Sequence, residues 1–470
     1  MRILLTTEGT YPSVMGGVST WVDQLIRGME EQSFHVLEVT GPRPAEAAYP
    51  LPGNVERVET PHLWTPRGGR ALRSAGGGAR AFDAALEALL RFADDDLDSF
   101  AHGLKVLARL GDRHDLWPAF ERRATWSLVR DAMVRLRGEP PHLAEIALAI
   151  AWLRGTLVPL LAVPPRSDEA HTTSNGLSAI PAWLAAQEHG VPLMLTEHGL
   201  YLRERYLSFD AERTPPAVKL LRAHFYRALS ERMYRDADLV VSVSEFNRSW
   251  QIHLGAPPER TRVVYNGVDP SGFPDAGPAP LPEPTVSWVG RIDPIKDLEM
   301  LVSAFRRVRD EIATARLRLF GPVPKGNEAY AQKVRHLAAH LQLDDAIAFE
   351  GPISPVYRAY HAADVVALSS VSEGFPYVAI EAMMCGRPVV ATRVGGVAEA
   401  VAHFGEIVQP RDPDGMGGAL TRLLADPRRR TQLGSGARAR ALSLFTLDKM
   451  YDGYRRLYAE LAHGPLEVAA

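Results

Sequence analysis

The chain has 470 residues, of which 46% are hydrophobic and 23% are charged. A chain of this length exceeds one compact core, so the sequence predicts two or more domains. The formal net charge of -3 argues against the global basic field that nucleic-acid-binding proteins carry. Because Cys385 is the single cysteine, intramolecular disulfides are excluded, and a secreted scaffold held by disulfides is disfavoured.

Two apolar segments bear on the cellular location. The apolar run at residues 3–5 is too short for a signal-peptide core and predicts a first strand over residues 2–7. The most apolar stretch, residues 143–163, contains Glu145, Arg154 and Pro159, which favour a buried or partner-facing helix over a membrane span. We therefore expect a cytoplasmic protein. This apolar stretch also motivates a second expectation, that residues 62–163 form a docking surface for a membrane partner or a lipid-linked acceptor at the inner face of the membrane.

Short β-rich runs alternate with helical patterns in residues 1–275, which predicts an α/β domain around a parallel sheet. A Gly16-Gly17 loop follows the first strand and leads into an amphipathic helix over residues 18–29. Across residues 62–163 the strand pattern disappears, and sequence rich in Ala, Leu, Arg and Asp predicts a largely helical insertion. The remaining predicted strands are residues 34–40, 170–173, 192–196, 239–243 and 262–265.

A second α/β series follows a break in composition. Residues 276–284 contain four prolines and predict a stiff linker. The second series occupies residues 285–445, and a final helix is expected over residues 446–462. Its predicted strands are residues 285–289, 316–320, 346–349, 365–368 and 388–391. Rossmann-like sheets bind ligands at the carboxyl ends of their strands, so we expect two such domains to face a common cleft.

The most informative motif is a pair of glutamates, Glu373 and Glu381, separated by seven residues in an E-x7-E pattern. On a mostly helical segment they would lie on one face, about 12 Å apart at about 1.5 Å per residue. That is too far for a glycosidase pair but suits the two ends of an extended ligand such as a nucleotide-sugar. Gly374 permits close backbone approach and Pro376 suits a first helical turn, where free N–H groups bind anions. The alternative is a helix N-cap and an exposed helix glutamate.

Two cations follow another predicted strand. That strand ends at Gly290, and Arg291 and Lys296 lie in the loop before the next helix. Fixed positive charge at this position neutralises a leaving diphosphate. The alternative is a pair of solvated surface cations, which is the usual environment of Arg and Lys.

In the N-terminal half, the candidates are weaker. Gly16 and Gly17 lie between strand and helix, where backbone N–H groups can approach a phosphate or an acceptor, although a plain tight turn has the same sequence. His198 lies just beyond the carboxyl end of a predicted strand, where α/β sites form; a lone histidine is as often structural. His171 is a weaker candidate after another strand.

Acidic clusters are candidates for metal sites. Asp236-Ala237-Asp238 has the Asp-x-Asp pattern of metal-dependent glycosyltransferases, but it precedes a predicted strand and is best interpreted as a turn. Asp94-Asp95-Asp96 lies in the insertion and is interpreted as a solvated face. No histidine or carboxylate cluster in the sequence has metal-ligand spacing, so no metal is expected.

Taken together, these motifs resemble glycosyltransferase family 4, whose members are retaining enzymes of the GT-B fold. The matching segments, in chain order, are Gly16-Gly17-Val18, the loop at His198, Asn266-Gly267-Val268-Asp269, Val289-Gly290-Arg291 with Lys296, Glu373-Gly374-Phe375-Pro376 with Glu381, and Thr392-Arg393-Val394-Gly395-Gly396. The match covers both Rossmann-like halves and omits the insertion. A helical N-terminal insertion fits the PelF-type (Pel-polysaccharide) group of this family. Two further segments look like that group: Thr7-Glu8-Gly9-Thr10-Tyr11-Pro12 before the glycine pair, and Thr196-Glu197-His198-Gly199 before Tyr201 and Glu204-Arg205.

The resemblance implies a role for each of these residues. Arg291 and Lys296, which follow Gly290, would hold the diphosphate of the donor. Its sugar hydroxyls would bind Glu373 and the amides around Gly374, Phe375 and Pro376, and its ribose hydroxyls would bind Glu381. Gly16 and Gly17 would close over the pyrophosphate and the acceptor, and His198 would contact the donor sugar near the reacting carbon. The loop containing Ile353 would offer backbone to the base, and the final segment, 446–470, would return to the N-terminal domain.

The implied reaction is metal-independent, retaining transfer of a hexose from a UDP-sugar, with UDP-glucose the leading guess, to a saccharide or lipid-linked acceptor. The pathway would be exopolysaccharide synthesis, with peripheral attachment to a membrane synthase complex, no cofactor and no nucleic acid. Two alternatives stay open: a nucleotide-sugar-binding subunit that regulates a membrane synthase, and a nucleotide-sugar epimerase. A glycan phosphorylase is disfavoured because nothing marks a pyridoxal lysine.

Overall fold

The computed structural model describes residues 1–41, 47–72, 76–277 and 282–463, without the side chains of residues 210 and 211. The chain forms two compact units. Unit 1 comprises Met1–Ser242, Arg248–Arg262 and Arg455–Ala470, and unit 2 comprises Val243–Asn247 and Val263–Tyr454. Part of the predicted linker, 278–281, and the end of the C-terminal segment, 464–470, lie outside the described residues.

Unit 1 is built on a seven-stranded sheet with the order β3-β2-β1-β4-β5-β6-β7. From β3 to β6, neighbouring strands run parallel, which confirms the predicted α/β class. The strand order reverses between β1 and β4, so the switch point of this sheet lies at their carboxyl ends. The strands are β1 (Arg2–Glu8), β2 (Ser33–Val39), β3 (Val55–Glu59), β4 (Glu169–Thr172), β5 (Leu193–Glu197), β6 (Leu239–Ser242) and β7 (Thr261–Val263).

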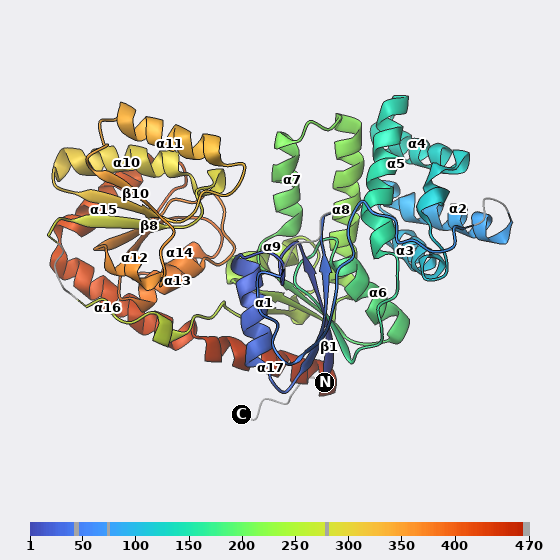
Figure 1. Ribbon diagram of the computed structural model, residues 1–470, viewed down its shortest axis with the longest axis horizontal. Coiled ribbons are helices and arrows are strands. Elements are labelled where there is room, and N and C mark those ends of the chain that lie inside the picture. The colour runs from blue at the N-terminus through green and yellow to red at the C-terminus, as the bar shows by residue number, and fades with distance from the viewer. Residues whose placement is uncertain (42–46, 73–75, 278–281, 464–470) are drawn as a thin grey trace. The chain divides into compact units, whose positions relative to one another are not determined.

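Helices fill the connections of this sheet, and the predicted helical insertion is present (Figure 1). The insertion contains α2 (Gly77–Leu89), α3 (Leu97–Gly111), α4 (Arg123–Arg137) and α5 (Leu143–Leu157), with 3-10 helices at Leu90–Asp94, Trp117–Glu121 and Val158–Leu160. The other helices are α1 (Gly17–Gly28), α6 (Ala179–His189), α7 (Tyr201–Ala211), α8 (Pro216–Asp236) and α9 (Glu245–His253), with a 3-10 helix at Pro258–Arg260.

The apolar stretch of the insertion is a core helix. Among the described residues, one helical segment, Leu143–Leu160, is long and apolar enough to cross a membrane, but 67% of it is buried inside the protein. Ile150 and Leu153 join the same hydrophobic cluster as residues of α3, α4 and α8. The docking surface expected on the insertion, residues 62–163, therefore loses its motivation, because most of the apolar surface of residues 143–163 is already covered. Leu143 and Leu148 are the exceptions on α5, with 72% and 48% of their surface exposed.

Unit 2 contains a parallel six-stranded sheet with the order β10-β9-β8-β11-β12-β13. Its switch point lies between β8 and β11. Along β11, Val365 and Ala367 join one hydrophobic cluster while Val366 and Leu368 join another. Both faces of the sheet are therefore buried at β11, which explains the continuous apolar run of this strand. The strands are β8 (Thr285–Val289), β9 (Arg316–Phe320), β10 (Ile347–Gly351), β11 (Val365–Leu368), β12 (Val389–Thr392) and β13 (Glu406–Val408).

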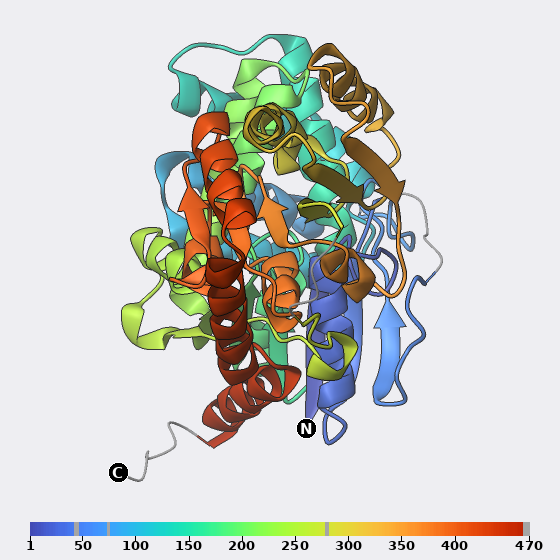
Figure 2. The same ribbon diagram turned by 90° about the vertical axis from the view of Figure 1, so that its left-hand side faces the viewer.

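Helices cover both faces of this second sheet (Figures 1 and 2). They are α10 (Leu298–Glu311), α11 (Glu328–His340), α12 (Tyr357–His361), α13 (Tyr377–Met384), α14 (Val397–Val401), α15 (Pro413–Ala425) and α16 (Pro427–Leu444), with 3-10 helices at Pro270–Gly272 and Pro294–Lys296. The final helix, α17 (Leu447–His463), belongs to unit 1 from Arg455 onward. There Arg455 pairs with Glu31 of unit 1 and donates to the carbonyl of Gly28.

Candidate active site

The switch point of unit 2 brings together two of the predicted site residues. Lys296 ends a 3-10 helix in the loop after β8, and Glu373 lies in the loop after β11. Nζ of Lys296 lies 2.6 Å from Oε1 of Glu373. The side chains keep 21% and 12% of their surface exposed, so the pair is partly shielded from water yet reachable by a ligand. This charge-assisted pair was not predicted from the sequence, because 77 residues separate the two partners.

The lysine loop is held by a side-chain cap. Oδ1 of Asp293 accepts from the backbone N–H of Ile295 at 3.1 Å, which starts the 3-10 helix. Its other oxygen accepts from Asn327 at 3.0 Å. Asp297 then adopts a left-handed conformation (φ 47°) and caps α10 by accepting from Met300. The local sequence therefore fixes the backbone on both sides of Lys296.

A glycine pair supports the glutamate loop. Gly395 has φ +51°, and a Cβ atom there would lie 1.7 Å from the carbonyl oxygen of Glu373. Only glycine permits this approach. The N–H of Gly396 donates to the carbonyl of Gly374 at 2.8 Å. The Gly395-Gly396 segment, found in the sequence only as part of a family pattern, thus holds the Glu373 loop in place.

Arg291 is exposed. Within the described residues it has no acidic partner, and its guanidinium is available to an anion. Gly290, just before it, is tied by its N–H to the carbonyl of Phe320 at 2.9 Å. The two predicted cations therefore differ: Lys296 is engaged by Glu373, whereas Arg291 faces solvent.

Glu381 lies on α13, and Oε2 accepts a hydrogen bond from the hydroxyl of the buried Tyr360. Burial raises the pKa of Glu381 to about 7, with the Tyr360 hydrogen bond acting in the opposite direction. The carboxyl group therefore titrates near neutral pH. Glu381 is not the exposed helix residue of the alternative interpretation.

The residues between the two glutamates present mostly their backbone. The helix begins at Tyr377, so Pro376 is its N-cap rather than part of its first turn. Phe375 is buried and stacks on Tyr265 with ring centroids 5.2 Å apart. Its side chain is therefore committed to the core, and only its backbone is offered to a donor. Ile353, after β10, is half-buried against the same hydrophobic cluster.

The other predicted residues lie in unit 1, in the segments that follow β1 and β5. Gly16 is the N-cap of α1 and Gly17 its first residue, with no acidic residue in the first turn. No heavy atom lies within 4 Å of the position that a Cβ of Gly16 would take. The helix start is thus open to a ligand, and its free N–H groups favour an anion.

His198 lies after β5 with its ring against that of Trp21, a residue of α1, at a centroid distance of 4.5 Å. Burial lowers the pKa of His198 to about 3, so its imidazole is neutral at physiological pH. His171 also has a pKa of about 3, because of burial and the neighbouring His198. Its two ring nitrogens each lie 2.8 Å from a hydroxyl, that of Tyr458 and that of Thr196. Sequence reasoning missed Trp21 and Tyr458 as site residues, since both were interpreted as helix residues.

A half-buried glutamate, Glu8, anchors the start of the helix that follows the His198 loop. Glu8, at the end of β1, accepts from the Tyr201 hydroxyl at 2.9 Å, from Arg205 at 3.0 Å and from the N–H of Leu177 at 2.8 Å. Glu8, Tyr201 and Arg205 come from the two segments on which the resemblance to the PelF-type group rests. The structure therefore gives those segments a shared function: they fix the start of α7, three residues after His198.

Glu197 anchors the other side of the His198 loop. Its Oε2 accepts from Tyr234 at 2.7 Å and from Gln251 at 3.1 Å, and its Oε1 accepts from the N–H of Tyr201. Burial raises the pKa of Glu197 to about 7. The loop that carries His198 is thus held at both ends by carboxylates.

The acidic clusters are structural. Oδ2 of Asp236 accepts from Trp183 and Arg232, and Oδ2 of Asp238 accepts from the N–H of Leu193, in the turn between α8 and β6. Asp96 caps α3, while Asp94 and Asp95 are exposed, as expected for a solvated face, and form ion pairs with arginines. Across the described parts of the chain, no group of three or more His, Cys, Asp or Glu residues is arranged to hold a metal ion.

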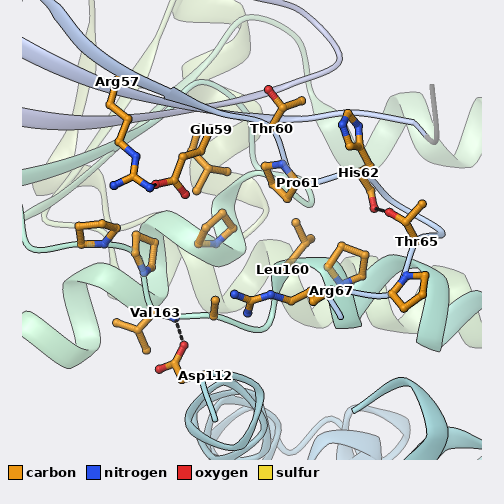
Figure 3. A pocket seen from close by; sticks show the side chains of 17 residues that line it. Arg57, Glu59, Thr60, Pro61, His62, Thr65, Arg67, Asp112, Leu160 and Val163 are labelled. Carbon is orange, nitrogen blue, oxygen red and sulfur yellow. Dashed lines mark hydrogen bonds and ion pairs between the residues drawn. The ribbon is translucent and has the colours of Figure 1, made fainter. Parts of the chain in front are cut away.

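A cavity of about 610 Å³ lies in unit 1, away from the predicted site residues. Figure 3 shows its lining side chains, with Arg57 beside Glu59 and Asp112 bonded to the backbone of Val163. None of the 17 lining residues that the structure describes is a predicted site residue. Ligand sites in open α/β sheets follow the switch point rather than cavity size, so the loops described above remain the predicted site.

Two family models match this chain. Residues 1–259 match the family described as "Domain of unknown function (DUF3492)", and residues 283–426 match "Glycosyl transferases group 1". The D-inositol 3-phosphate glycosyltransferase of Streptosporangium roseum is 31% identical over 327 residues, covering 65% of this chain and 73% of the relative. This chain is a group 1 glycosyltransferase. The corresponding enzyme of Streptomyces bingchenggensis is 33% identical over 306 residues, covering 61% of the chain and 66% of the relative. The glycosyltransferase thus spans about two thirds of the length of such relatives, and its N-terminal half belongs to the DUF3492 family.

Solved structures share the GT-B fold of this glycosyltransferase. Anabaena Alr3699/HepE in complex with UDP superposes with a TM-score of 0.64 at 17% identity, covering 98% of this chain and 100% of that one. Sucrose-phosphate synthase (tll1590) from Thermosynechococcus elongatus also gives 0.64, at 22% identity and 98% coverage of both chains. These identities show the fold alone. The closer resemblance to the PelF-type group stays a prediction.

Proposed function

We propose that this glycosyltransferase is a retaining, metal-independent hexosyltransferase that uses a UDP-sugar, with UDP-glucose as the first candidate. The acceptor would be a saccharide or a lipid-linked saccharide in exopolysaccharide synthesis, and the location cytoplasmic. The observation that carries the proposal is the Lys296–Glu373 pair at the switch point of unit 2. Arg291 lies in the same loop as Lys296 and is exposed.

The donor assignment rests on the chemistry of the loops in unit 2. Lys296 and Arg291 supply positive charge for a diphosphate, and Glu381 supplies a carboxylate for the ribose hydroxyls. Structures of HepE were solved with UDP, with UDP and glucose, and with UDP-glucose. That protein shares the fold and supports UDP as the first nucleotide to test.

The chemical step would develop negative charge on the leaving phosphate and positive charge on the sugar ring. Preorganised cations stabilise the first; Glu373 would stabilise the second through the sugar hydroxyls. The leaving phosphate itself would take the proton of the acceptor hydroxyl, since transfer with retention uses one face of the sugar. In unit 1, the neutral His198 would accept or donate one hydrogen bond to the donor sugar, and the open start of α1 would bind the pyrophosphate.

The test is a nucleotide-release assay across UDP-, GDP- and ADP-sugars, with and without oligosaccharide acceptors, in the presence of EDTA. We expect UDP release that depends on an acceptor and survives EDTA. Binding of a nucleotide-sugar without turnover would favour a regulatory subunit instead. Sugar isomerisation or nucleotide loss without any acceptor would favour an epimerase.

A further inference from the structure

A buried pair of serines lies directly behind the Lys296–Glu373 pair. Ser369 and Ser370 follow β11 and are fully buried. The hydroxyl of Ser370 donates to Oε1 of Glu373 at 2.6 Å, the same oxygen that Lys296 binds. Neither serine is exposed to solvent, so neither can contact a substrate directly.

The serine loop is also tied to its two neighbours. Ser369 donates to the backbone carbonyl of Lys296 at 2.7 Å, and the N–H of Val371 donates to the carbonyl of Ile295 at 2.9 Å. On the other side, the hydroxyl of Thr392 donates to the carbonyl of Ser370 at 2.6 Å. Hydrogen bonds of these buried residues therefore connect the loop after β11 to the loop after β8 and to the end of β12.

We propose that Ser370 is a positioning residue that fixes the Glu373 carboxylate, so that its Oε2 points to the donor sugar. This proposal rests on the proposed function. Two donors meet on Oε1, and within the described residues Oε2 has no hydrogen-bonding partner. A donor diphosphate competes with Glu373 for Lys296, since both are anions. When Lys296 turns to the diphosphate, Ser370 is the contact that keeps the carboxylate in its rotamer.

A positioning role for Ser370 should affect kcat, whereas a binding role should affect the donor KM. Loss of one hydrogen bond to a charged group corresponds to roughly a 10- to 100-fold effect. Ser370→Ala should lower kcat by about this factor and leave the donor KM and the Kd for UDP nearly unchanged, because the groups proposed to hold the nucleotide are intact. The matched control is Ser287→Ala on β8. Ser287 is equally buried, and its hydroxyl has no hydrogen-bonding partner among the described residues, so its loss should leave kcat unchanged.

A double-mutant cycle tests whether Ser370 acts through Glu373. In an enzyme that already carries Glu373→Gln, the further change Ser370→Ala should have little additional effect on kcat, because the carboxylate that Ser370 positions is gone. Ser370→Cys, which keeps the size but donates weakly, should show a smaller loss than Ser370→Ala and serves if the alanine variant unfolds. Thermal unfolding and UDP calorimetry of each variant check folding and nucleotide binding.

The outcomes separate the two proposals. One outcome would overturn the positioning role alone. In it, the wild-type enzyme is active and Glu373→Gln is impaired, but Ser370→Ala and Ser370→Cys have the kcat of the wild type. Effects of Ser370→Ala and Glu373→Gln that multiply in the double variant would also overturn it, since they would act independently. A wild-type chain that turns over no nucleotide-sugar would overturn the proposed function, and this inference with it.

Discussion

Lys296 donates to Oε1 of Glu373 across 2.6 Å, although the two residues lie on different loops of unit 2. The contact places a cation and a carboxylate where the strand order of the sheet reverses. A ligand that bridges them must satisfy both charges at once. A sugar diphosphate does so, because its phosphates are anionic and its hydroxyls donate to a carboxylate.

The first prediction concerns the lysine. Lys296→Met should weaken UDP binding by about 10- to 100-fold, the cost of one charge-assisted hydrogen bond in a partly buried site. Isothermal titration calorimetry with UDP measures the effect. Lys325→Met, which removes an exposed lysine from the same unit, is the control and should bind UDP as wild type does. If Lys296→Met bound UDP with the same affinity as the wild type, the diphosphate would not bind at this loop.

The second prediction concerns pH and Glu381. Its pKa is raised to about 7 by burial, so the carboxyl group is half protonated at neutral pH. Ribose hydroxyls donate to the ionised form; donor affinity should therefore rise as pH increases from about 6 to 8. Glu381→Gln should remove this dependence and raise the donor KM by roughly tenfold at pH 8, with kcat little changed. A pH dependence that persists in Glu381→Gln would assign it to another group.

The third prediction concerns the buried histidines of unit 1. Their pKa values of about 3 lie below the ordinary value of 6.5. Because the unfolded chain then binds protons that the folded chain does not, stability is full above pH 6.5 and falls as pH drops below it. Each histidine contributes a slope of about 1.4 kcal/mol per pH unit. His171→Gln should therefore reduce the loss of thermal stability between pH 6.5 and 5, while His102→Gln, at an exposed position of α3, should not. An unchanged pH profile in His171→Gln would show that His171 is protonated in the folded protein.

The fourth prediction concerns the anchor of α7. Glu8 accepts from Tyr201 and Arg205 in a setting where its side chain is only 15% exposed. Glu8→Ala leaves these donors unpaired, so the start of α7 should open more readily, with amide exchange in α7 faster by about 10- to 100-fold. Hydrogen exchange followed by mass spectrometry measures this change. Glu31→Ala removes an exposed pair with Arg455 and should leave α7 unchanged. If the amides of α7 exchanged equally fast in both variants, the contacts of Glu8 would stabilise α7 no more than a surface ion pair does.

Much of the fold followed from the sequence. Three predicted strands of unit 2, 285–289, 316–320 and 365–368, match β8, β9 and β11 residue for residue. β8 and β11 are buried along their whole length, and β9 alternates buried leucines with half-buried arginines, so each strand has a clear apolar pattern. β3 and β13 were missed. β3 is an edge strand with the sequence VERVE and a mostly solvated face, and β13 has three half-buried residues, so neither carries an apolar signal.

The site was less predictable than the fold. Glu373, Lys296 and Arg291 could be proposed as site residues because their loops follow predicted strands. The contacts of Ser370, Trp21 and Tyr458 were not, since a hydroxyl or an aromatic ring within an apolar pattern gives no sign of its partner. The apolar stretch at residues 143–163 was a poor reason to expect a docking surface on the insertion, because composition alone does not show which neighbour covers a helix.

The turnover number of Glu373→Gln tests the central claim most directly. Glu373 is proposed to act on the sugar as positive charge develops, so its effect belongs to the transition state rather than to nucleotide binding. We predict a kcat for UDP release with acceptor that is lower by about 10- to 1,000-fold, with the Kd for UDP within about twofold of wild type and unchanged thermal stability. A folded Glu373→Gln enzyme with wild-type kcat would contradict the assignment of the active site to the Lys296–Glu373 pair.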